Sequence, residues 1–139
     1  MFIGSEVYRA TDQRFGHPLG IPRVSLTMDL CRILGWLNEI NFVHSPCASK
    51  SELADFHSPA YINAVQLADK SGECSAFDRE HYHIGINGNP VFKGMFERPA
   101  TACGGGLWAA KRLSAVGGVF YNIGGGQHHG QPARARGFC

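Results

Sequence analysis

The chain closes with GGVFYNIGGGQHHGQPARARGFC, residues 117–139, which joins a short apolar run to three glycines and a pair of histidines. Residues 119–123 are β-branched or aromatic apart from one asparagine, and this composition predicts a buried strand. Glycines 124–126 then end that strand. In open α/β sheets, ligands bind at the carboxyl ends of the strands. His128 and His129 follow such an end directly, so they are candidate catalytic residues.

The rest of the chain shows alternating strand and helix signals. Glycines 104–106 lie inside a predicted helix, where each costs about 1 kcal/mol relative to alanine, so they predict a close approach of that helix to the sheet. Strands followed by helices are typical of an α/β protein with a parallel sheet. Strands are predicted near residues 2–8, 41–44 and 119–123. Helices are predicted over 23–35, 49–56, 58–72 and from Pro99 to Gly117, with a further helix start at 89–96. Loops are predicted over 9–22 and 70–82.

Capping signals locate two of these helices. Ser49 and Glu52 have the spacing of a capping box, in which each residue satisfies a backbone N–H group of the other. Ser58 followed by Pro59 is typical of an N-cap and first helical residue, and Gly72 predicts the end of that helix. In the helix over 23–35, leucines and isoleucine recur every three or four residues and predict a packed apolar face.

Composition excludes several classes of protein. The 139 residues are 44% hydrophobic, and the net charge of +2 is too small to indicate a nucleic acid or an anionic membrane as partner. No stretch reaches the roughly 20 apolar residues of a membrane span, and the first residues lack the features of a signal peptide. Five cysteines without a C-x-x-C motif favour reduced thiols over a disulfide framework. We therefore expect a soluble, cytoplasmic protein.

Several motifs together resemble one known family. They are YNIGGGQHHG (121–130), ARGFC (135–139), HPLGIPRV (17–24), FHSPAYI (56–62) and NPVFKGMF (89–96). With these residues in this order, the chain resembles the zinc-dependent histone deacetylases and their acetoin-utilisation and acetylpolyamine relatives. The resemblance implies an α/β fold. It would be a truncated part of the three-layer, open parallel-sheet arginase/deacetylase-like fold. Residues 1–139 would be the amino-terminal portion of a single catalytic domain.

The same resemblance implies roles for individual residues. In this family a zinc ion polarises an acetamide carbonyl and activates a water, while an imidazole pair exchanges protons with the water and the leaving amine. By position, His129 would be the main general base and acid and His128 its electrostatic partner. The Gly137 carbonyl would meet the substrate, Phe138 would form a wall of the acyl-lysine channel, and Pro18 would lie at the channel mouth.

The chain also departs from the family in two places. Gly88 stands where many eukaryotic members carry an aspartate that binds the substrate backbone, so the substrate can be a small acetylated amine as well as an acetyl-lysine. The zinc ligands of the family, an Asp-x-His motif and a later aspartate, have no counterpart in the sequence. We therefore expect Zn²⁺ in the complete protein, with its ligands in a carboxyl-terminal part, and none held by these 139 residues, which are expected to be inactive alone.

Other interpretations of the same residues remain open. Gly124–Gly126 can bind an anion through backbone N–H groups in a non-catalytic module, with help from Arg134 and Arg136. Without the resemblance, Phe138 is more typical of an ordinary core position, and Pro18 is equally compatible with a plain turn. The pattern His81-x-His83 offers two metal ligands if it lies on a strand, although no third ligand is near in sequence.

Overall fold

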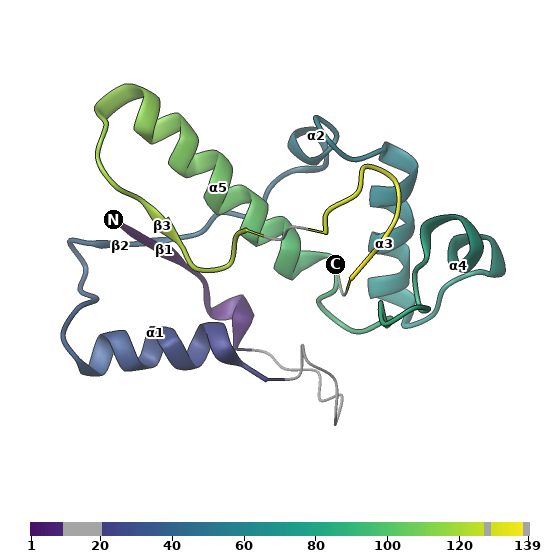
Figure 1. Cartoon of the computed structure of the whole chain (residues 1–139), viewed down its shortest axis with the longest axis horizontal. Helices are drawn as coiled ribbons and strands as arrows, with labels where there is room; N and C mark the ends of the chain where they lie inside the picture. The colour runs from purple at the N-terminus through teal and green to yellow at the C-terminus, as the bar shows by residue number, and fades with distance from the viewer. Residues whose placement is uncertain (10–20, 127–128, 138–139) are drawn as a thin grey trace. The chain divides into compact units, whose positions relative to one another are not determined.

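The computed structural model describes residues 1–9, 21–126 and 129–137 (Figure 1). The described chain divides into two compact units. The first comprises Met1–Ala48 and Glu97–Gly125, and the second comprises Ser49–Phe96 and the segment from Gly126 onward. No helix in the described ranges has both the length and the apolar character needed to cross a membrane.

A three-stranded parallel sheet forms the centre of the first unit (Figure 1). Its order is β2 (Phe42–His44), β1 (Phe2–Gly4) and β3 (Tyr121–Asn122). Phe2 of β1 pairs with Phe42 on one side and with Tyr121 on the other, and Ile3 pairs with Val43 and Asn122. Ile3 of the central strand is fully buried. The parallel sheet confirms the predicted α/β class.

Two of the strands are shorter than predicted. β1 ends at Gly4 because Ser5 caps a 3-10 helix, η1 (Glu6–Tyr8), by accepting the Val7 N–H. β3 contains only Tyr121 and Asn122. Val119 was expected to be buried within that strand, but its side chain is 83% exposed and its carbonyl accepts the Met1 ammonium instead.

Helix α5 (Glu97–Val116) packs against the end of β2 and against β3 through its glycines. A Cβ atom at Gly104 would overlap the Pro46 carbonyl oxygen, and one at Gly105 would lie 2.5 Å from Ser45 Oγ. Asn122 Nδ2 donates to the Ala102 carbonyl at 2.8 Å. The predicted close approach is thus confirmed at the first two glycines of 104–106, whereas the third is exposed and has only one neighbouring atom, at 3.8 Å.

Helix α1 (Arg23–Ile33) covers the other face of the sheet (Figure 1). Its buried residues are Ser25 and Met28, and Met28 reaches Gly4 of β1. Of the apolar residues that predicted a packed face, Leu26, Leu30 and Ile33 are 57%, 54% and 82% exposed, and Leu37 lies beyond the end of the helix, so that prediction was wrong within this chain. The periodicity identified the helix but not the face that meets the sheet.

The second unit contains α2 (Lys50–Leu53), α3 (Pro59–Ser71) and α4 (Ala76–Tyr82). Both predicted caps are confirmed. Ser49 and Glu52 form a capping box, and α3 begins at Ser58-Pro59 and ends at Gly72 in the left-handed conformation. The core of this unit packs Ala64 and Ala68 of α3 against the fully buried Ile84.

Two predictions in this unit were wrong. Residues 76–82, expected to be loop, form α4, because Ser75 caps the helix by accepting the Asp78 N–H. Residues 89–96 were expected to start a helix, but residues 93–96 form turns because the Asp69 carboxylate accepts the N–H groups of Gly94 and Phe96, at 2.7 and 3.1 Å. His81 therefore lies on a helix, not on a strand.

Candidate active site

His129 and Gly137 lie in direct contact within the second unit. A Cβ atom added at Gly137 would lie 2.5 Å from both Cγ and Cδ2 of the His129 ring, a distance that real side chains essentially never show. Gly137 also has φ +62°, in the left-handed region that favours glycine. The imidazole therefore packs on the glycine backbone in a way that no other residue at 137 permits. His128, Phe138 and Pro18 lie outside the described residues.

The loop that carries His129 is fixed to the helices of the second unit by three hydrogen bonds. The Ser58 N–H donates to the Pro132 carbonyl at 2.8 Å, and His57 Nδ1 lies 3.0 Å from the Gln131 carbonyl. The Ala135 N–H donates to the carbonyl of Tyr82, also at 2.8 Å. These contacts hold residues 131–135 against the start of α3 and the end of α4. The backbone on which His129 lies is thus ordered by tertiary contacts.

The glycines that follow β3 serve close packing in the first unit. A Cβ atom at Gly124 would overlap the phenol of Tyr8, and one at Gly125 would lie 2.9 Å from Asn122 Nδ2. The Tyr8 hydroxyl is buried without a hydrogen-bond partner among the described residues, and burial raises its pKa to about 12. This phenol therefore stays protonated at neutral pH.

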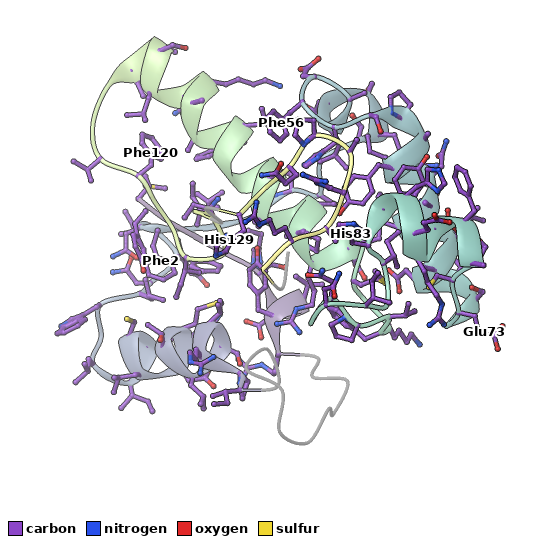
Figure 2. The ribbon with its side chains drawn as sticks, turned by 45° about the vertical axis from the view of Figure 1, so that its right-hand side comes forward. Phe2, Phe56, Glu73, His83, Phe120 and His129 are labelled. Carbon is purple, nitrogen blue, oxygen red and sulfur yellow. The ribbon has the colours of Figure 1, made fainter. Side chains whose placement is uncertain are left out.

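Arg134 and Arg136 lie on the carboxyl-terminal segment of the second unit. Gly124 and Gly125 pack within the first unit, whereas both arginines belong to the second unit. There the arginines and Gly137 line a cavity of about 270 Å³ together with the loop that follows α4. The alternative of a non-catalytic anion-binding module built on Gly124–Gly126 has no support from these positions. Figure 2 shows His129 on the carboxyl-terminal loop and His83 at the end of α4.

The described residues do not form a metal site. No group of three or more histidine, cysteine, aspartate or glutamate side chains within residues 1–9, 21–126 and 129–137 is arranged to hold a metal ion. Catalytic zinc is usually held by three protein ligands. The donor set in this part of the chain therefore does not fit a catalytic zinc ion.

Substitution of Gly137 tests the contact with His129. We expect Gly137→Ala to displace the imidazole, because the new Cβ atom would occupy the position of the ring and the residue would keep an unfavourable positive φ. A displacement of about 1 Å at a reacting group can lower turnover about 100-fold. The measurement is kcat of the enzyme that the resemblance in the sequence implies, with Gly130→Ala as the matched control, because a Cβ atom at Gly130 has no neighbour within 4 Å. Equal turnover of the two variants would contradict the expectation.

The fold and the site together define a class of protein. The chain has an α/β fold with a parallel sheet, and a glycine-rich turn at the end of β3 leads into a loop on which an imidazole packs against a glycine. A family model described as the histone deacetylase domain matches residues 17–139, and the chain belongs to this family.

Relatives and solved structures agree with this assignment. The chain is 37% identical to the acetoin utilization protein AcuC of Bacillus subtilis, over all of this chain and 36% of that protein. It is 28% identical to the histone deacetylase RPD3 of Saccharomyces cerevisiae, over 99% of this chain and 31% of that protein. The crystal structure of an HDAC homolog from Aquifex aeolicus matches with a TM-score of 0.93 at 36% identity, covering 99% of this chain and 37% of that one. A structure of an HDAC homolog complexed with SAHA gives the same values. The chain thus spans about a third of the length of the proteins it matches.

Proposed function

We propose that this chain is the amino-terminal part of a zinc-dependent deacetylase that hydrolyses the amide of an acetylated amine, of the acetyl-lysine or acetyl-polyamine type, in the cytoplasm. The observation that carries the proposal is the packing of His129 on Gly137 within a segment that the histone deacetylase model matches. In hydrolases of this kind, an imidazole beside the scissile amide can act as general base and then as general acid.

The proposed role of His129 is proton transfer. One ring nitrogen takes a proton from the attacking water and then gives it to the nitrogen of the leaving amine, so that the imidazole is regenerated when acetate and free amine form. Gly137 positions the ring, because its missing side chain leaves the space that the imidazole occupies. For His128 we propose an electrostatic role beside His129. Phe138 and Pro18 are proposed to line the substrate channel.

Two features support a small substrate over a peptide. Gly88 carries no carboxylate to accept hydrogen bonds from a peptide backbone. Its φ of +81° is also a conformation that residues with side chains adopt rarely, so the backbone at this position favours glycine. A free or short acetylated amine needs no such contact. We therefore propose that peptide context around the acetyl-lysine contributes little to recognition.

Comparison of the isolated 139-residue chain with the full-length enzyme tests this function. Because the described residues form no metal site, we expect the isolated chain to retain no stoichiometric zinc and to hydrolyse no acetylated amine. We expect the full-length enzyme to contain zinc, to deacetylate Nε-acetyl-lysine or N-acetylputrescine, and to lose that activity on chelation. Metal analysis and release of free amine are measured on the same preparations. One tightly held zinc ion and turnover in the isolated chain, or a full-length enzyme without activity on either substrate, would contradict the proposal.

A further inference from the structure

A cavity of about 270 Å³ lies on the second unit beside Gly137. Its lining brings together two segments about fifty residues apart in sequence. His83, Asn87 and Asn89 come from the loop after α4, and Arg134, Arg136 and Gly137 come from the carboxyl-terminal segment. Gly137 therefore both lines the cavity and contacts the ring of His129, the proposed catalytic imidazole.

The backbone around this cavity is held in one conformation by short hydrogen bonds. The Gly85 N–H donates to the Asn89 carbonyl at 2.6 Å, and the Asn89 N–H donates to the Ile86 carbonyl at 2.9 Å. The bond from Ala135 to Tyr82 connects this loop to the arginine-bearing segment. Asn89 is only 7% exposed. The cavity is therefore preformed.

Two lining residues have an unusual backbone conformation. His83 and Asn87 have φ of +56° and +53°, in the left-handed region that residues with side chains seldom adopt. Residues held in such conformations cluster at functional sites, where the surrounding structure maintains them. Both conformations lie in the loop that forms one wall of the cavity. His83 adopts this conformation as the C-cap of α4, and Asn87 adopts it within the loop that follows.

The chemistry of the lining favours an anion. Each of the two guanidinium groups carries five N–H donors and no acceptor, in a planar arrangement that matches a carboxylate. Asn87 adds a side-chain amide, and none of the described residues that line the cavity carries a carboxylate of its own. Arg134 and Arg136 are both exposed, so they are accessible to a ligand from solvent. A cationic ligand such as a polyamine would meet like charge.

We propose that this cavity binds a carboxylate on the substrate, and that the enzyme prefers acylated amines that carry one, such as free Nε-acetyl-lysine, over acetylated polyamines. The proposal rests on the proposed deacetylase function, because it places the reacting amide at His129. Gly137 connects the imidazole to the cavity, so one ligand can present its amide to the ring and its carboxylate to Arg134 and Arg136. The proposal also distinguishes acetyl-lysine from acetyl-polyamine, the two substrate types that the sequence left open.

Substrates with and without a carboxylate test this preference in the full-length enzyme. The probes are Nε-acetyl-lysine, its α-carboxamide and N-acetylputrescine. A hydrogen bond to a charged group changes kcat/KM about tenfold or more, so we expect the acid to exceed the carboxamide by at least that factor. In Arg136→Gln and Arg134→Gln, the ratio of the acid to N-acetylputrescine should fall about tenfold. Arg112→Gln, which removes one positive charge from the first unit, is the matched control and should keep that ratio. Equal kcat/KM for the acid and the carboxamide, or equal losses for all three substrates in Arg136→Gln, would overturn the proposal.

Calorimetric binding to the His129→Ala protein separates this proposal from the proposed function. Failure of the wild-type enzyme to hydrolyse any of the three substrates would overturn the deacetylase function. The dissociation constants of Nε-acetyl-lysine and of its α-carboxamide would still test whether the cavity binds a carboxylate. At least tenfold tighter binding of Nε-acetyl-lysine than of its α-carboxamide, lost in Arg136→Gln, would support the carboxylate site, and equal dissociation constants would exclude it.

Discussion

Replacement of His129 by alanine in the full-length enzyme is expected to lower kcat by about 10²- to 10⁴-fold, the usual contribution of a general acid–base group. Binding of the substrate should change far less, because the proton is transferred only during the chemical step. The Gly137 backbone would lose the ring that packs on it. The measurement is a full Michaelis profile with Nε-acetyl-lysine.

His81→Ala is the matched control for this variant. His81 is an exposed histidine of α4 in the same unit, where its ring stacks on Phe77 at 3.9 Å between centroids. It should leave kcat within a factor of about two, since its ring stacks on Phe77 and it does not line the cavity. If His129→Ala retained parental turnover, or if both histidine variants lost the same activity, the assignment of the general base would be wrong.

Gly104→Ala is expected to cause a large loss of stability. The added methyl group would overlap the Pro46 carbonyl oxygen and lie 2.8 Å from the Ala48 amide nitrogen, both of which are backbone atoms. Ala48 is fixed in place because its N–H donates to the Ala100 carbonyl of α5 at 2.9 Å. Overpacking of this kind typically costs 1–3 kcal/mol and occasionally more, and we expect about 3 kcal/mol.

The same helix supplies the control. Gly106→Ala adds the identical group to an exposed position with one neighbouring atom at 3.8 Å, so it should stabilise the helix by about 0.5–1 kcal/mol. Thermal unfolding of the two purified variants should therefore give midpoints on opposite sides of the parent. For Gly104→Ala the midpoint should fall by roughly 10 °C. A midpoint for Gly104→Ala at or above the parental one would contradict the backbone contact.

The sequence predicted those parts of the fold that depend on interactions between residues close together in the chain. The capping box at Ser49 and the Ser58-Pro59 helix start depend on residues within one turn, and both form as expected. The same kind of signal failed at residues 92–96, because the Asp69 carboxylate on α3 takes the N–H groups that a helix would have used. Nothing in residues 92–96 themselves indicates that distant contact.

The candidate site was predictable only in part. The motif around the histidine pair identified the loop and the family, and the family model confirms the latter. The contact of Gly137 with His129 and the cavity beside it could not be predicted, because His83 and Asn87 are brought to Arg136 by tertiary packing. A glycine eight residues from its partner histidine gives no periodic signal. The catalytic and substrate-binding roles of His128, His129, Gly137, Phe138 and Pro18 remain predictions.

The central position of β1 has a consequence for how the protein folds as it is synthesised. β1 contains residues 2–4, but its partner β3 contains residues 121–122, and the Met1 ammonium meets the Val119 carbonyl 118 positions away. Ribosomes add about 5–20 residues per second, so β3 emerges roughly 6–24 s after β1. Until then one edge of β1 has no strand to pair with, and contacts so distant in sequence form slowly because the intervening chain must be closed into a loop. The helices of the second unit are synthesised in this interval and can form before the sheet of the first unit is complete.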